Sequence, residues 1–206
     1  ATDLQALVEN SVPEGKDLEY KLKLPGNSES DKKEFLAAVS SFANCIGGDL
    51  IFGIAEDEEK RIPKSLDGLP ISSLAGQQER LENLLRDGIQ PRIPGISMRQ
   101  IGLKDALVAL VVRIPRSWKS HHRDVSGSHD KFYSRNSKGK YPLDVAELRI
   151  AFNNLQTVTD KIRSFRLERV SKLVDNETPV PFDGQHKICL HLIPLDSFAP
   201  SRHYDL

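Results

Sequence analysis

Carboxylates in two stretches of the sequence are the side chains best suited to chemistry. Glu14 and Glu19 lie close together near the start, and the acidic run 56–59 follows an apolar segment expected to lie beside them. Converging carboxylates can hold Mg²⁺ or Mn²⁺, which stabilises the charge of an attacked phosphate ester and activates a water molecule. Lys21 could offset the negative charge of such a site or contact the phosphate.

The same residues have an ordinary interpretation as surface charge. Apolar and charged residues alternate over 18–24, which predicts a strand with Glu19 and Lys21 on one face. On that face they could form an exposed ion pair, and Glu56 to Glu59 could form a solvated turn. Because surface charge runs are usually solvated, the residues alone favour this second interpretation.

A basic segment runs from Arg113 to Lys140. It holds eight Lys or Arg residues against two Asp, whereas the whole chain has 29 basic and 29 acidic residues and a net charge of zero. A local excess of this kind predicts one basic face, and interleaved aromatic residues suit phosphate contacts with base stacking. The alternative is a solvated loop with core aromatics. The candidate nucleic-acid-binding residues are Arg113, Arg116, Lys119, Arg123, Lys131, Tyr133, Arg135 and Lys138, with Trp118 and Phe132 beside them.

The central stretch of the chain predicts a helix, a tight turn and a buried strand. Asp31 and Glu34 have the spacing of a capping box, and apolar residues then recur at helical spacing as far as Ile46. Gly47-Gly48 ends the helix, since glycine adopts positive φ without a Cβ penalty. Residues 50–54 are fully apolar, which is typical of a central strand covered on both faces.

This arrangement resembles a family of DNA-binding domains, the Schlafen/AlbA-like family, which is also called divergent AAA-4. The resemblance rests on LEYK at 18–21 and SFANCIGGDLIFGI at 41–54, and it extends through Asp67-Gly68-Leu69, residues 111–117 and residues 132–137. It covers about Val12 to Phe152. It implies an α/β domain of the α+β type, with a mixed, mostly antiparallel sheet flanked by helices.

The resemblance also implies a choice of functions. Nuclease members of the family carry a three-acid metal site, which by motif falls on Glu14, Glu19 and either Asp57 or Glu56. The expected metal ligands are therefore Glu14, Glu19 and Asp57 with Mg²⁺ or Mn²⁺, and Lys21 joins them as a catalytic candidate. The family pattern places an Asp where this sequence has Glu56, and NCIGG replaces N-T-D-G-G.

The leading prediction is a module that binds DNA or RNA through the basic segment, for example in a transcriptional regulator. One alternative is a metal-dependent endoribonuclease that cleaves structured RNA such as tRNA. Another is a protein-interaction or assembly domain. The resemblance further implies a homodimer.

The remaining segments predict mostly regular structure in two parts. A Schlafen/AlbA-like domain is expected over 1–152, and a helix-plus-strand extension over 153–206 begins a C-terminal segment, as in a fragment of a longer chain. The expected helices are 3–10, 74–89, 143–152 and 160–174; the expected strands are 96–101, 106–114, 131–134 and 186–193; and the expected loops are 61–73 and 116–130.

Several cofactors and locations are disfavoured by the sequence. Cys45 and Cys189 lack the spacing of a zinc site or a disulfide framework, and both are expected to be buried thiols. His121-His122 is expected to be solvated rather than metal-binding. Family members are sometimes labelled ATP-binding, but Gly47-Gly48 is not a P-loop, so ATP is unsupported. Without a signal peptide or a long apolar run, we expect a soluble, cytoplasmic protein with no membrane partner.

Overall fold

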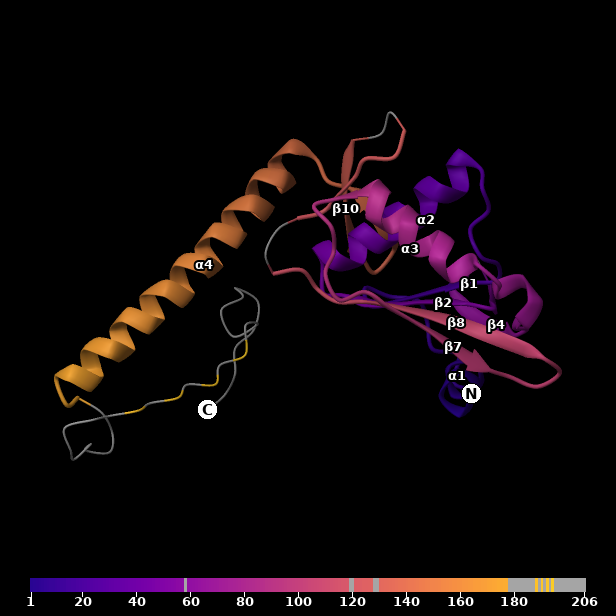
Figure 1. Cartoon of the computed structure of the whole chain (residues 1–206), viewed down its shortest axis with the longest axis horizontal. Helices are drawn as coiled ribbons and strands as arrows, with labels where there is room; N and C mark the ends of the chain where they lie inside the picture. The colour runs from indigo at the N-terminus through magenta and orange to yellow at the C-terminus, as the bar shows by residue number, and fades with distance from the viewer. Residues whose placement is uncertain are drawn as a thin grey trace. The chain divides into compact units, whose positions relative to one another are not determined.

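A five-stranded sheet forms the centre of the N-terminal part of the chain (Figure 1). The computed structural model describes residues 1–57, 59–118, 121–127 and 130–177, together with 188, 190, 192 and 194. Contacts divide the chain into two compact units, Ala1–Leu148 and Arg149–Leu206. The elements of the described residues, in chain order, are α1 (Thr2–Glu9), β1 (Leu18–Lys21), α2 (Glu29–Asn44), β2 (Gly48–Phe52), β3 (Ile54–Asp57), β4 (Ile62–Leu66), β5 (Leu69–Pro70), the 3₁₀ helix η1 (Ile71–Leu74), α3 (Gln77–Gly88), β6 (Ile89–Gln90), β7 (Ser97–Gly102), β8 (Leu107–Ile114), β9 (Arg123–Asp124), β10 (Lys131–Asn136), β11 (Gly139–Pro142) and α4 (Val145–Val174).

The sheet is mixed and mostly antiparallel, which confirms the predicted fold class. Strand order is β1-β2-β8-β5, with β7 also paired to β8. Only the β1–β2 pair is parallel in this sheet, with Glu19 opposite Leu50. A second sheet has the order β11-β10-β9-β6, and β3 pairs with β4 in a two-stranded sheet.

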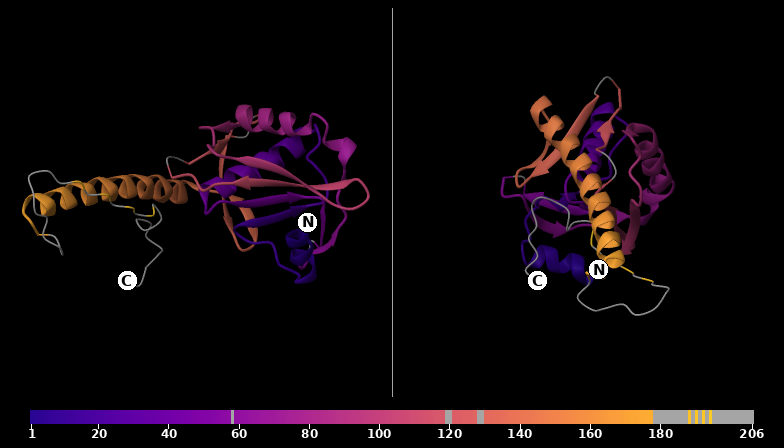
Figure 2. Two further views of the ribbon diagram at one scale, coloured as in Figure 1. Left: turned by 60° about the horizontal axis from the view of Figure 1, so that its bottom comes forward. Right: turned by 90° about the vertical axis from the view of Figure 1, so that its left-hand side faces the viewer.

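Apolar residues cover both faces of the central strands, as the fully apolar run at 50–54 predicts. Leu50, Leu110 and Val112 face the larger core beneath α2 and α3, whereas Ile51 and Ala109 face a smaller core that includes Leu4 of α1. Figure 2 shows α3 on one side of the sheet and α1 on the other. Alternate residues of one strand therefore serve two cores.

The turn between α2 and β2 explains the glycine pair. Gly47 has φ 78°, and a Cβ there would lie 2.7 Å from the backbone nitrogen of Arg116. Gly48 has φ 158°, and a Cβ there would lie 2.4 Å from the carbonyl oxygen of Asp17. Both positions thus require the absence of a side chain, because other backbone segments pass directly against the turn.

The start of α2 differs from the prediction. Ser28 is the N-cap, and its side chain accepts a hydrogen bond from the backbone N–H of Asp31. The helix therefore begins before Asp31, and the predicted capping box of Asp31 and Glu34 is wrong. Serine is as good a cap as aspartate, and the sequence offers both within a few residues.

Two further stretches correct the prediction. Residues 61–73, expected to be mostly loop, contain β4, which pairs with β3, and β5, which pairs with β8, and η1 begins at Ile71. The two helices expected over 143–152 and 160–174 are one helix, α4. Asp144 and Glu147 form a reciprocal capping box at its start, and no Gly or Pro interrupts it.

Some predicted elements match closely and one cannot be compared. Helices α1 and α3 and the β7–β8 hairpin lie where they were expected, and the expected strand 131–134 continues to Asn136. Most of the strand expected over 186–193, including Cys189, lies outside the described residues. Cys45 is a half-buried free cysteine at the end of α2.

Replacing Ile114 with alanine is expected to lower the free energy of unfolding by about 2–5 kcal/mol, since the change leaves a cavity in the core. Ile114 is 1% exposed, whereas Ile71 is 57% exposed. The matched control Ile71→Ala should change stability by about 0.5 kcal/mol or less. Urea denaturation followed by circular dichroism measures both, and equal effects would contradict the burial of Ile114.

Candidate functional site: a buried network of ion pairs

Glu14 closes the free edge of β1. Its Oε1 accepts the backbone N–H of Tyr20 at 2.8 Å, and its Oε2 accepts two hydrogen bonds from Arg61, at 2.9 Å from Nη2 and 3.2 Å from Nε. Tyr20 lies on an edge strand, where its N–H would otherwise lack a partner within the sheet. The carboxylate of Glu14 therefore substitutes for a neighbouring strand.

Glu19 lies at the centre of the network and is 5% exposed. Its Oε2 accepts a hydrogen bond of 2.6 Å from Nη1 of Arg135, which is itself 3% exposed. The ammonium groups of Lys21 and Lys140 each lie 3.7 Å from its Oε1. Three cations from three strands, β1, β10 and β11, thus converge on one carboxylate.

Arg135 joins the second sheet to the rest of the unit. Its guanidinium stacks over the ring of Phe42 at 3.9 Å and donates to Oγ of Ser41 at 3.3 Å, both on α2. A buried guanidinium needs both an opposite charge and hydrogen-bond acceptors. Glu19 supplies the charge and Glu19 and Ser41 both accept from Nη1, while the buried Nε has no hydrogen-bond partner among the described residues. Arg135 is therefore a structural link, not a surface phosphate contact.

Of the two alternative third acids, the structure brings Glu56 into the network and not Asp57. Lys21 Nζ lies 3.0 Å from Oε1 of Glu56. Successive side chains of a strand point to opposite sides, so Asp57 points away. Its Oδ1 accepts the backbone N–H groups of Glu59 and Lys60, and its Oδ2 lies 3.7 Å from Lys64 Nζ.

The network shifts the pKa values of its members in different directions. Burial alone would raise the pKa of Glu19, but the charges of Lys140, Arg135 and Lys21 outweigh it and lower the pKa below 4.5. Burial would lower the pKa of Lys21, and the charges of Glu19 and Glu56 raise it instead. Burial raises the pKa of Glu56 against the opposing effect of Lys21, and Glu14 adds to the increase.

The carboxylates do not fit a Mg²⁺ or Mn²⁺ ion as they are placed. Both oxygens of Glu14, Oε2 of Glu19 and Oε1 of Glu56 are each engaged by a nitrogen donor. Hard cations require several oxygen ligands directed at one point. Among the described residues, no group of three or more His, Cys, Asp or Glu could hold a metal ion. Lys21 occupies the position between Glu19 and Glu56 that an ion would need.

The candidate residues of the basic segment are divided among different environments. Arg135 and Tyr133 are buried, which corrects the expectation that they contact a ligand at the surface. Arg113 is exposed and forms a two-point pair with Asp49, with both nitrogen–oxygen distances 2.8 Å. Arg123 pairs with Asp130 at 3.1 Å. Lys131 and Lys138 are exposed, and Lys119 lies outside the described residues.

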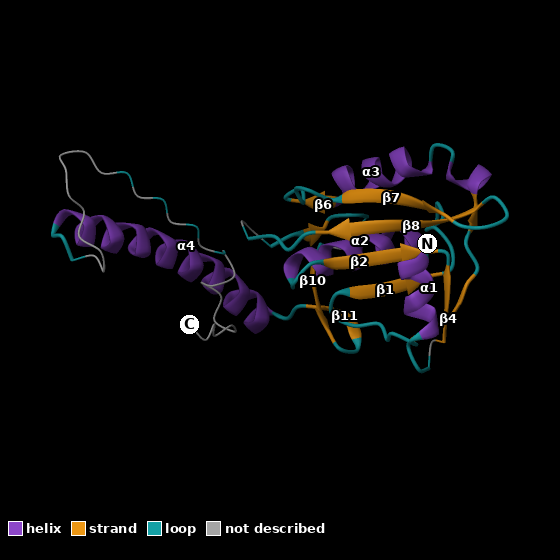
Figure 3. Cartoon of the chain, turned by 90° about the horizontal axis from the view of Figure 1, so that it is seen from below, coloured by secondary structure: helices purple, strands orange, loops and turns teal. Residues whose placement is uncertain are grey.

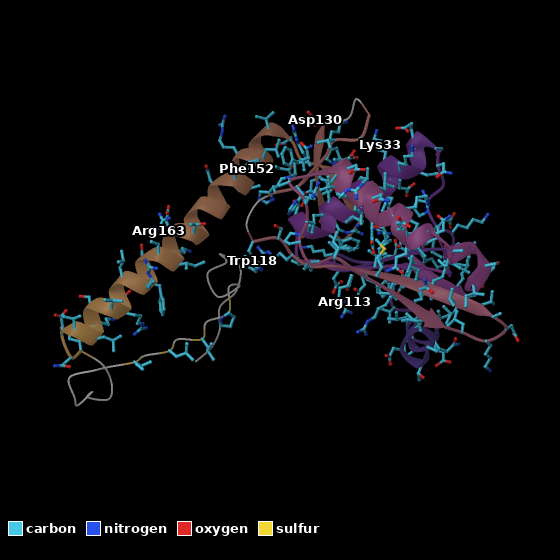
Figure 4. The ribbon with its side chains drawn as sticks, in the orientation of Figure 1. Lys33, Arg113, Trp118, Asp130, Phe152 and Arg163 are labelled. Atoms are coloured by element: carbon cyan, nitrogen blue, oxygen red, sulfur yellow. The ribbon has the colours of Figure 1, made fainter. Side chains whose placement is uncertain are left out.

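The predicted single basic face is therefore divided in two. In Figure 4, Asp130, the partner of Arg123, lies near the top of the N-terminal unit, whereas Trp118 and Arg113 lie lower. The two groups are close in sequence but separated in space because β8 and β10 belong to different sheets. Arg116 belongs to the first group, since its guanidinium stacks over the indole of Trp118 at 3.8 Å.

Asn44, which the sequence arguments did not single out, connects α2 to the second sheet. Its side-chain Nδ2 donates to the carbonyl oxygens of His122 and Tyr133, and its Oδ1 accepts the N–H of His122 at 2.7 Å. The signal was present as the Asn of the SFANCIGG stretch. Asn44 thus contributes three hydrogen bonds that anchor residues far away in sequence.

His122 is buried, so the expectation of a solvated histidine pair is wrong for it. It is 1% exposed, and its Nδ1 lies 2.6 Å from the carbonyl oxygen of Pro91. Burial lowers its pKa, and the charge of His121 adds to this against the opposing hydrogen bond to Pro91. A neutral ring with Nδ1 as the donor fits this environment.

Comparison with known proteins identifies the family. The family model described as Schlafen, AlbA_2 matches residues 14–144, more than half of the chain. The chain belongs to this family. A search of curated proteins finds no match.

Two solved structures are similar to part of this chain. One is the DIP2311 protein from Corynebacterium diphtheriae, with 22% identity, a TM-score of 0.42, and coverage of 71% of this chain and 27% of that one. The other is the N-terminal domain of a RecG-related protein from Nitrosomonas europaea, with 22% identity, a TM-score of 0.40, and coverage of 65% and 82%. This chain thus spans about a quarter of the DIP2311 protein. Among the described residues, no helix has the length and apolar character needed to span a membrane.

Glu19→Gln is expected to destabilise the protein by about 3–5 kcal/mol at pH 7, because it leaves Arg135 buried without its counter-charge. The folded-state pKa of Glu19 is lowered, so between that pKa and 4.5 the unfolded state binds more protons. Wild-type stability therefore falls as pH decreases through this window, and the difference between wild type and variant narrows.

Urea unfolding at several pH values between 3 and 7 measures the effect. Glu29→Gln is the matched control, because the side chain of Glu29 is 76% exposed, and it should follow the wild-type pH dependence. A Glu19→Gln variant with the same pH dependence as wild type would show that the ion pair with Arg135 is absent in solution.

Proposed function

We propose that this chain is a nucleic-acid-binding domain that contacts DNA or RNA phosphates through the Arg113–Trp118 segment. The observation that carries the proposal is the pair formed by Arg116 and Trp118, in which a guanidinium lies 3.8 Å above an indole ring. A cation stacked on an aromatic plane suits both a phosphate and an adjacent base. Membership in the Schlafen, AlbA_2 family supports the same class of function.

Arg113 adds a second cation to this surface. Its side chain is 71% exposed, and Asp49 engages Nε and Nη2 only. A guanidinium held in this way keeps a fixed orientation while its Nη1 amino group is directed elsewhere. A fixed guanidinium loses less conformational entropy when it binds a phosphate.

An open part of the main sheet extends the surface. The register places Ser97 opposite Arg113 and Arg99 opposite Val111, so Arg99 and Arg113 are on the same face. Arg99 is exposed. Figure 3 shows α1 in front of only one end of this sheet face. The Arg99 and Arg113 side chains therefore lie on one face of this sheet, and Arg116 follows two residues after the end of β8.

The double variant Arg113→Gln/Arg116→Gln is expected to weaken binding to a single-stranded oligonucleotide. The slope of log K against log[salt] should fall in magnitude by about 1.4, since each phosphate contact on a single strand contributes about 0.7 to the slope through counterion release. Lys60→Gln/Lys104→Gln removes the same charge at two exposed lysines elsewhere and should leave the slope unchanged. Fluorescence anisotropy across a salt series provides both values. An unaltered slope in the first variant would exclude the segment from the interface.

The endoribonuclease alternative has a separate test. Labelled tRNA is incubated with the protein in Mn²⁺ and in EDTA, and the gel is read for both shift and cleavage. We expect a shift without metal-dependent fragments, because nitrogen donors engage Glu14, Glu19 and Glu56. Fragments that appear with Mn²⁺ and disappear in Glu56→Gln would instead establish the carboxylates as catalytic.

A further inference from the structure

A cavity of about 500 Å³ opens between β1, the segment that follows it and the first half of α2. Its floor is apolar and includes Phe35, Leu50 and Phe52, and the two phenyl rings are tilted by 47° with centroids 6.3 Å apart. Small-molecule sites typically measure about 300–1,000 Å³ and combine an apolar lining with a few polar groups. The cavity has that size and lining.

Two polar side chains at this cavity have unused binding capacity. Glu19 lines it while 5% exposed, and Oε1 accepts no hydrogen bond within the described residues, since Lys21 and Lys140 stand 3.7 Å away. Lys23, also in the lining, forms no ion pair or hydrogen bond with any described residue. One group can accept a hydrogen bond deep inside, and the other can bind an anion at the entrance.

The outer wall of the cavity is fixed in place. Arg80 on α3 donates to the carbonyl oxygens of Pro25 and Gly26 and to Oδ1 of Asn27. These bonds hold the loop after β1 against α3, so the opening is formed before any ligand arrives. Preformed sites bind more tightly because less ordering is required on association.

We propose that this cavity, which lies on the sheet face opposite to Arg99 and Arg113, takes one unpaired nucleobase of a bound nucleic acid. The flat ring would contact the apolar floor, an exocyclic amino group would donate to Oε1 of Glu19, and the flanking phosphate would pair with Lys23. A base inside a duplex cannot present these edges, so the site selects single-stranded or extruded nucleotides. The proposal rests on the proposed nucleic-acid-binding function and gives it a ligand class.

Calorimetric titration of the full chain with adenosine 5′-monophosphate and with ribose 5-phosphate tests the role of the base. The nucleotide should bind at least about tenfold more tightly, since stacking of a base contributes about 1–3 kcal/mol. Lys23→Glu should weaken nucleotide binding by about tenfold, as expected for the loss of a charged hydrogen bond. Lys104→Glu, with the same charge change at an exposed turn, should bind as wild type does.

A second variant fills the cavity without changing charge. Ala38 lines the cavity from α2 and is 2% exposed, so Ala38→Leu should obstruct the base and weaken nucleotide binding. If Ala38→Leu fails to fold, the nucleotide affinity of Lys23→Glu is the test of the base site.

The outcomes separate the two proposals. The base site is overturned if the nucleotide and ribose 5-phosphate bind with equal affinity, or if Lys23→Glu binds the nucleotide as the wild type does. In either case, oligonucleotide binding by the wild type would still support the proposed function. If the wild type binds neither oligonucleotide nor nucleotide, the proposed function fails and the base site fails with it.

Discussion

The buried ion pair between Glu19 and Arg135 is the interaction on which the N-terminal unit depends. It connects β1 of the main sheet to β10 of the second sheet, and through Phe42 and Ser41 it includes α2. Desolvating two charges is costly, and the cost is offset only where geometry and additional hydrogen bonds are favourable. Here a 2.6 Å contact, a hydrogen bond from Arg135 to Ser41 and an aromatic ring beneath the guanidinium contribute to that offset.

The same pair accounts for the positions of the neighbouring charges. Once Arg135 holds one oxygen of Glu19, Lys21 bridges Glu19 and Glu56, and Arg61 holds Glu14 against the edge of β1. Each acid that motif arguments would assign to a metal thereby has a cationic partner. Asn44 reinforces the connection with three hydrogen bonds between α2 and the backbone around His122 and Tyr133. The residues of this sequence that match the family motif therefore have roles in packing the domain, whether or not they also take part in chemistry.

Local periodicity was sufficient to predict much of this arrangement. The alternation over 18–24 correctly put Glu19 and Lys21 on one face, and the helix, glycine pair and apolar strand are present with small shifts at their ends. Periodicity could not reveal that Arg135 is buried, because its partner Glu19 is more than a hundred residues away. It could not choose between Glu56 and Asp57 either, since that choice depends on the pairing of β3 with β4, which contains an irregularity between Ala55 and Glu56.

The basic segment shows why charge counted along a sequence is a weak guide to a surface. The segment passes from β8 to β9 and β10, which belong to different sheets, so its cations separate: Arg135 enters the interior, Arg123 pairs with Asp130, Arg113 pairs with Asp49, and Arg116 stacks over Trp118. Among the described cations of this segment, Arg113 and Arg116 are the two that the proposed function assigns to phosphate contacts.

Glu19 connects the structural network to the cavity. Its lowered pKa keeps it ionised at neutral pH, so it acts there only as a hydrogen-bond acceptor. Its Oε2 is held by Arg135, whereas its Oε1 has only the more distant Lys21 and Lys140. A ligand that donates to Oε1 would therefore leave the ion pair with Arg135 in place. Binding and stability then depend on different oxygens of one carboxylate, which allows a buried structural residue to be part of a recognition site.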